Sequence, residues 1–154
     1  MIFLSLGTHE QPFARAPKAL KPLVRIGQTV LVQYGCTTPQ FGWSGFEWVE
    51  YLPYDEMSRR IEEADAFFCH AGVGSILSAL MLGITPIVIP RLARLDEHVD
   101  NHQLQLTQKL VARGLVINGD TADVVATARR ARGSRGEARG PNMSLLSAVR
   151  AAVG

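Results

Sequence analysis

The chain has 154 residues, of which 47% are hydrophobic and 19% are charged, and its formal net charge is +2. These values are typical of one globular domain, and no apolar run is long enough to span a bilayer. The start of the chain lacks the basic segment of a signal peptide, and Cys36 and Cys69 stand alone, so we expect a reducing cytoplasm and no disulfide framework.

Short apolar runs alternate with amphipathic segments along the chain. Apolar runs of this length predict buried strands, and amphipathic segments predict helices packed on them. We expect strands over residues 2–6, 29–34, 46–51, 64–69, 85–90 and 115–117. We expect helices over about 13–25, 56–64 with Asp55 as N-cap, 76–83, 99–113, 121–131 and 142–153. The alternation predicts an α/β domain, a Rossmann-like parallel sheet with helices on both faces.

The C-terminal part of the chain is basic. Residues 129–150 carry six arginines and one glutamate, a net charge of +5, which leaves −3 for the remainder. Such a segment could face an anionic membrane or an acidic partner, or it is a solvated helix with a loose tail. It has no interleaved aromatic residues, so nucleic-acid binding is not expected. We expect one domain over residues 1–131 and a basic flexible linker with a short helix over 132–154.

A glycine turn follows the fourth expected strand, at residues 69–75, with glycines at Gly72 and Gly74. Glycines let the backbone approach a ligand, and the first N–H groups of a helix point out of its N-terminus, so the turn favours a phosphate or pyrophosphate. It could also be only a tight connection, because Leu77 replaces the third glycine of the dinucleotide fingerprint. His70 is either a functional residue or a strand-end histidine with a satisfied hydrogen bond.

Polar segments gather at one edge of the expected sheet. Ligands of parallel sheets bind beyond the carboxyl ends of the strands. Residues 7–9, 52–54, 70–75 and 91–102 all lie at that edge. Gly7 can offer bare backbone to a ligand and Thr8 a hydroxyl. This convergence favours a ligand site more strongly than any single motif does.

Four motifs occupy this edge: Gly7-Thr8-His9-Glu10-Gln11-Pro12-Phe13, His70-Ala71-Gly72-Val73-Gly74-Ser75-Ile76, Pro90-Arg91-Leu92-Ala93-Arg94, and Glu97-His98-Val99-Asp100-Asn101-His102-Gln103. Together they resemble the signatures of the donor-binding, C-terminal half of GT-B glycosyltransferases of family 28. The resemblance covers about residues 1–118. It is greatest to subunits of exopolysaccharide glycosyltransferases of the PssE/EpsF type. It extends to the small subunit of the eukaryotic lipid-linked N-acetylglucosaminyltransferase and to the C-terminal domain of MurG, a transferase of peptidoglycan synthesis.

The resemblance implies a sugar nucleotide as donor, most often UDP-linked, and assigns three groups of residues to it. The group implied to hold the diphosphate is Gly7, Thr8, His70, Gly72, Val73, Gly74, Ser75 and Arg91. The group implied to meet the nucleoside is Leu52, Pro53, Tyr54 and Ser78, the last in place of an acid that holds the ribose in many relatives. The group implied to hold the donor sugar is Glu97, Asp100, His102 and Gln103, of which the last two match paired glutamines of MurG.

Glycosyl transfer from such a donor releases a diphosphate, whose growing negative charge must be stabilised. The helix N-terminus and a cation such as Arg91 or Arg94 can do this, although both arginines could also be plainly solvent-exposed. The sequence holds no Asp-x-Asp motif and no His/Cys cluster, so we expect no metal cofactor. The catalytic base is open: His9 and Glu97 are candidates, and a partner residue is another.

GT-B active sites lie between two similar domains, and this chain supplies one. The resemblance therefore implies a membrane-anchored, acceptor-binding glycosyltransferase subunit as partner and a lipid-linked saccharide as acceptor. It places the chain at the inner face of the membrane through that partner. Two alternatives stay open: a non-catalytic enhancer or binding subunit of such a transferase, and an unrelated nucleotide-binding Rossmann-like domain.

Overall fold

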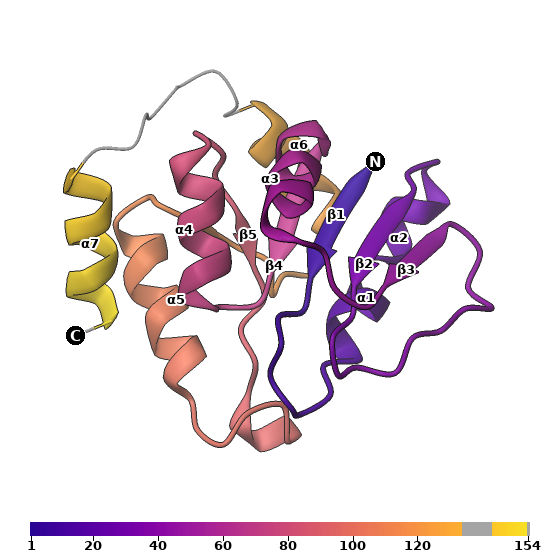
Figure 1. Cartoon of the computed structure of the whole chain (residues 1–154), viewed down its shortest axis with the longest axis horizontal. Helices are drawn as coiled ribbons and strands as arrows, with labels where there is room; N and C mark the ends of the chain where they lie inside the picture. The colour runs from indigo at the N-terminus through magenta and orange to yellow at the C-terminus, as the bar shows by residue number, and fades with distance from the viewer. Residues whose placement is uncertain (134–142, 154) are drawn as a thin grey trace.

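The computed structural model describes residues 1–133 and 143–153. Its centre is a six-stranded sheet in which every neighbouring pair of strands is parallel. The strand order is β3-β2-β1-β4-β5-β6, with β3 toward the right of Figure 1. The strands are β1 (Ile2–Ser5), β2 (Val30–Gln33), β3 (Phe46–Val49), β4 (Ala66–Cys69), β5 (Ile87–Val88) and β6 (Ile117–Asn118). The predicted α/β class and the parallel sheet are confirmed.

Helices cover both faces of the sheet. One face carries α1 (Arg15–Ala19), α2 (Lys21–Arg25) and α6 (Val124–Gly133). The other face carries α3 (Tyr54–Glu63), α4 (Val73–Met81) and α5 (His102–Ala112), and α7 (Met143–Val153) packs beside α4 and α5 (Figure 1). A short 3-10 helix, η1 (Ala93–Leu95), follows β5. Among the described residues, no helix combines the length and the apolar content needed to cross a membrane.

Two hydrophobic cores lie on the two faces of the sheet. Phe3 and Phe67 pair in register across β1 and β4, with ring centroids 5.3 Å apart, and belong to the core under α3, α4 and α5. The next residues along these strands, Leu4 and Phe68, belong to the core under α1, α2 and α6. Successive strand residues point to opposite faces, and both faces are covered. This explains why the central strands are continuous apolar runs in the sequence.

Several helices begin elsewhere than the sequence predicts. The helix expected over 13–25 is divided at Leu20 into α1 and α2, because Pro22 has no N–H to continue the hydrogen-bond ladder. In α3 the N-cap is Pro53, and Asp55 lies in the first turn instead of capping the helix. There its carboxylate still faces the positive end of the helix dipole.

The helix of the glycine turn is longer than expected. It begins at Val73, three residues before the predicted start, with Gly72 as N-cap. The residue after its C-cap is Gly83, whose φ of 75° confirms the predicted C-terminal glycine. In contrast, α5 begins at His102, three residues later than expected, because the segment after η1 is irregular.

The C-terminal part contributes to the core. Helix α6 runs to Gly133, past the expected end of the domain, and residues 134–141 of the expected linker lie outside the described residues. The expected terminal helix is present as α7, whose Val149 and Ala152 are buried in the same core as Phe3. At least this helix is therefore packed on the domain.

Candidate functional site

A pocket of about 610 Å³ opens at the carboxyl ends of β1 and β4. From β1 the chain continues to β2 and β3 on one side of the sheet, and from β4 it continues to β5 and β6 on the other side. Parallel sheets bind ligands at such a switch point in strand order. The pocket is lined by residues of the turns after β1 and β4, of the end of β2 and of α3, α4 and α5: Ser5, Gly7, Thr8, His9, Gln33, Tyr54, Met57, His70, Gly72, Gly74, Ser75, Ser78 and Gln103.

The N-terminus of α4 lies at this pocket. Its N-cap, Gly72, is followed by Val73, Gly74 and Ser75, and no described side chain caps the helix. The first N–H groups of a helix have no partner within it and carry a partial positive charge. Gly74 and Ser75 line the pocket, so this helix end can hold an anion such as a phosphate.

His70 forms part of the pocket between two glycines. A Cβ atom placed on Gly7 would lie 2.2 Å from His70 Nε2, and one placed on Gly72 would lie 2.4 Å from His70 Cε1. Both positions therefore require glycine, and Gly7 also has a φ of 72°. Burial, helped by the positive charge of Arg91, lowers the pKa of His70 to about 3, so the imidazole is neutral at physiological pH.

A stacked histidine pair joins the turn after β1, which carries His9, to the segment after η1, which carries His98. The rings of His9 and His98 lie 4.5 Å apart between centroids, with an interplanar angle of 13°. His9 Nε2 also lies 2.8 Å from Gln11 Oε1. The predicted base candidate His9 thus lies in the pocket lining, next to Thr8.

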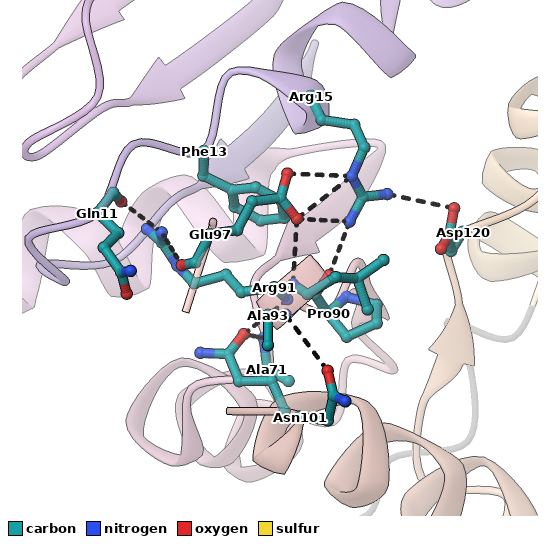
Figure 2. A network of polar contacts seen from close by, with 12 residues as sticks. Gln11, Phe13, Arg15, Ala71, Pro90, Arg91, Ala93, Glu97, Asn101 and Asp120 are labelled. Carbon is teal, nitrogen blue, oxygen red and sulfur yellow. Dashed lines mark hydrogen bonds and ion pairs between the residues drawn. The ribbon is translucent and has the colours of Figure 1, made fainter. Parts of the chain in front are cut away.

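Arg91 lies inside the protein. It belongs to the segment after β5, and its side chain reaches the turn after β1 (Figure 2). Its side chain is only 1% exposed, which rules out the alternative that Arg91 is plainly solvent-exposed. The guanidinium donates to three backbone carbonyls: those of Leu6 at 2.8 Å, Gln11 at 2.6 Å and Glu97 at 3.1 Å. Arg91 is absent from the pocket lining, so its placement favours a role in holding these segments together over direct contact with a diphosphate. Burial lowers its pKa to about 10, and it stays charged at neutral pH.

Glu97 is also turned inward. Its carboxylate accepts hydrogen bonds from Arg15 Nε at 3.1 Å and Arg15 Nη2 at 3.0 Å, and from the Leu92 amide at 3.1 Å (Figure 2). The residue is 4% exposed and does not line the pocket. A buried carboxylate with these partners is not free to take a proton from an acceptor or to hold a sugar, so neither predicted role of Glu97 fits its placement.

Only some of the residues that the resemblance assigns to the nucleoside lie at the pocket. Tyr54 and Ser78 line the pocket, whereas Leu52 and Pro53 do not. The Ser78 hydroxyl donates to the Gly74 carbonyl at 2.8 Å, which leaves only its lone pairs for a ribose.

Of the residues implied to hold the sugar, Gln103 alone lines the pocket. Asp100 is exposed and accepts from the His102 amide at 2.9 Å, so its carboxylate binds the start of α5. This hydrogen bond lowers the pKa of Asp100. Like Asp100, His102 and Arg94 are exposed and stand outside the lining.

Sequence reasoning missed four residues of this region. Ser5 and Gln33 end β1 and β2, are both buried, and contact each other through Ser5 Oγ and Gln33 Oε1 at 3.3 Å. Polar residues at the carboxyl ends of predicted strands are a signal that could have found them. Met57 of α3 reads as a core residue in the sequence. Arg15 gives no local signal, since its partners Glu97 and Asp120 are far along the chain.

The comparisons with known proteins agree with this geometry. The chain matches the glycosyltransferase family 28 C-terminal domain over residues 1–129. The chain belongs to this family. It is thus a family 28 donor-binding domain, as the motifs predict.

Individual known proteins are also similar to the chain, one in sequence and two in fold. The family 28 chain is 38% identical over 82 residues to the UDP-N-acetylglucosamine transferase subunit ALG13 of Yarrowia lipolytica (strain CLIB 122 / E 150), covering 53% of this chain and 37% of that protein. It shares its fold with the glycosyltransferase SnogD from Streptomyces nogalater at a TM-score of 0.54 and 19% identity, covering 97% of this chain and 43% of that one. The kitacinnamycin glycotransferase gives a TM-score of 0.56 at 20% identity, with 99% and 40% covered. The chain thus spans less than half the length of each.

Proposed function

We propose that this chain is the donor-binding, catalytic subunit of a two-component glycosyltransferase. It moves a sugar from a UDP-sugar to a lipid-linked saccharide in exopolysaccharide synthesis. The observation that carries this proposal is the pocket at the switch point of the sheet, into which the uncapped N-terminus of α4 opens. A nucleoside diphosphate is the kind of ligand that such a helix end stabilises.

The chemistry follows from the same helix end. The bond between the anomeric carbon and the β-phosphate oxygen breaks, and the leaving diphosphate gains negative charge. The amides of residues 73–75 are oriented before the reaction and stabilise that charge as it develops. The buried charge of Arg91 adds a positive potential near the pocket, where it already lowers the pKa of His70. The acceptor oxygen forms the new bond, and its proton goes to a base of this chain, with His9 as candidate, or of the partner.

The need for a partner is part of the proposal. The chain spans 37% of a relative whose own name calls it a transferase subunit. Bringing a donor and an acceptor together requires surfaces on both sides of the reacting atoms. We assign the second surface to a membrane-anchored, acceptor-binding subunit, through which the chain would lie at the inner face of the membrane.

UDP titration followed by amide NMR tests the donor site. We expect the amides of residues 72–76 to shift in the wild-type chain. The variant Gly74→Glu adds bulk and negative charge to the pocket lining, where nothing lies within 4 Å of the new Cβ, and should weaken UDP binding by about tenfold or more. Gly42→Glu makes the same change at another uncrowded glycine outside the lining and should bind UDP normally. Shifts confined to remote amides would overturn the site.

Transfer assays on a lipid diphosphate sugar acceptor test the catalytic assignment. The chain and its partner together should turn over, and the chain alone should transfer little sugar. Gly74→Glu should abolish turnover of the assembled pair. Unchanged turnover of that variant, with UDP binding lost, would favour a non-catalytic binding subunit instead.

A further inference from the structure

The side-chain amide of Gln103 has a fixed orientation. Gln103 lies in the first turn of α5 and is 6% exposed. Its Oε1 accepts from two backbone amides, Ala71 N–H at 3.1 Å and Arg91 N–H at 3.0 Å. Turning the amide around would place its NH2 group against two N–H donors. The oxygen therefore faces these amides, and the nitrogen faces away from them.

This nitrogen meets the imidazole of His70. Gln103 Nε2 lies 3.2 Å from His70 Nδ1. An amide NH2 group can only donate, so Nδ1 must accept and carry no proton. A neutral imidazole with an unprotonated Nδ1 carries its proton on Nε2.

The Nε2 side of the ring faces Gly7 and Gly72 at the pocket. Among the described residues we find no acceptor for Nε2, so its N–H is available to a ligand. The titratable and charged groups around the ring are Arg91, His9 and His98, all of which disfavour a second proton. Together with burial, they keep the ring neutral across the range in which most histidines titrate.

We propose that Gln103 is a positioning residue that holds His70 in the Nε2–H tautomer, so that a neutral imidazole donates a hydrogen bond to the diphosphate of the donor. The identity of the ligand rests on the proposed function, whereas the tautomer does not. A neutral donor binds the diphosphate product less tightly than an imidazolium would, because hydrogen bonds that involve charge on both partners are stronger. Its strength is also constant over the physiological pH range.

Long-range ¹H–¹⁵N correlation of the imidazole tests the tautomer without any ligand. In the wild-type chain, His70 should show a protonated Nε2 and an unprotonated Nδ1 from about pH 5 to pH 9. Finding the proton on Nδ1, or finding that His70 titrates within this range, would overturn the inference. Because the measurement is made on the wild-type chain, it does not depend on a variant that folds.

The variant Gln103→Glu gives the sharper test. One carboxylate oxygen can still accept from the Ala71 and Arg91 amides, while the other now accepts from His70 Nδ1. His70 should therefore take a proton on Nδ1 and titrate at a higher pH than in the wild type. Gln105→Glu makes the same charge change at an exposed position of α5 and should leave the His70 signals unchanged.

UDP affinity then links the tautomer to the ligand. The affinity of the wild-type chain for UDP should be nearly constant from about pH 6 to pH 8.5, apart from the effect of the ionisation of UDP itself. The control variant Gln105→Glu should show that same effect and no other. In Gln103→Glu the affinity should fall about tenfold or more as His70 loses its second proton, because a bare Nε2 then faces a phosphate oxygen. A pH profile of Gln103→Glu that matches the control would refute the positioning role. If neither the wild-type chain nor either variant bound UDP while the wild type showed the predicted tautomer, the proposed function would be refuted and the inferred tautomer would stand.

Discussion

Neighbouring polar residues of one motif can have opposite environments in this chain, one side chain buried and the other exposed. Arg91 and Arg94 belong to one motif, yet Arg91 is buried against three carbonyls and Arg94 is exposed. The buried guanidinium is stabilised because Nη1 and Nη2 donate to backbone oxygens and because the group lies over the Phe13 ring, 4.9 Å from the centroid, although Nε has no partner among the described residues. Arg91 thereby connects segments that border the pocket.

Replacing Arg91 with methionine should lower the free energy of unfolding by about 3 kcal/mol or more, because three buried carbonyls lose their donors. Urea unfolding measures the change. Arg94→Met removes the same charge from an exposed side chain and should change stability by less than about 0.5 kcal/mol. Equal effects of the two substitutions would contradict the structural role of Arg91.

His70 makes stability depend on pH. Its pKa is about 3 in the folded chain and near 6.5 when unfolded, so between these values only the unfolded chain binds the proton. The contribution of His70 to the free energy of unfolding should therefore fall as the pH falls below 6.5, by on the order of 1.4 kcal/mol per pH unit, and should be constant above it. Between pH 7.5 and pH 5 the wild type should lose about 2 kcal/mol more than His70→Asn, in which the other histidines remain. Parallel losses in both proteins would show that His70 is not the group responsible.

At the scale of elements, the last helix is part of the core. α7 packs on α4 and α5, and Lys109 Nζ donates to the Ala152 carbonyl at 3.3 Å. Arg113 of the same region donates to the Ala148 carbonyl. The basic character of residues 129–150 suggested a role at a membrane or a partner, and that role stays a prediction. The packing of α7 adds a structural role.

Two neighbouring alanines test the docking of α7. Ala152 is 2% exposed, whereas Ala151 is exposed. Ala152→Asp should destabilise the chain by about 2–3 kcal/mol, because a carboxylate is buried without a partner. Ala151→Asp shares the cost in helix propensity and helix dipole, and should destabilise the chain by only about 1 kcal/mol or less in thermal or urea unfolding. If both variants were equally stable, α7 would not be packed in solution as described.

At the scale of the whole molecule, groups of the protein itself supply positive potential at the pocket, where the proposed transfer would need it. The N-terminus of α4 and the buried Arg91 both contribute positive potential at the pocket. Within the described residues, no group of three His, Cys, Asp or Glu side chains is arranged to hold a metal ion. Because the N-terminus of α4 and Arg91 can stabilise the leaving diphosphate under the proposed function, we expect transfer by the chain and its partner to proceed in EDTA at a rate close to that with Mg²⁺. Complete loss of activity in EDTA, restored by Mg²⁺, would contradict this expectation.

The sequence by itself determined the α/β class, the parallel sheet, the two glycine turns and the family. These features depend on local patterns: apolar runs give strands, and glycines such as Gly72 and Gly83 mark the ends of a helix. Helix starts were less predictable, since the first residue of α4 or α5 depends on packing as well as on propensity.

Only the tertiary structure decided which polar residues of the motifs face the pocket. Arg91 finds its acceptors at Leu6 and Gln11, 85 and 80 residues away, and Glu97 finds Arg15 at a separation of 82. The same long-range contacts join Gln103 to the turn of His70 and so fix a proton on one ring nitrogen. Local pattern cannot encode such choices, because they depend on which buried donors and acceptors the folded sheet brings within hydrogen-bonding distance.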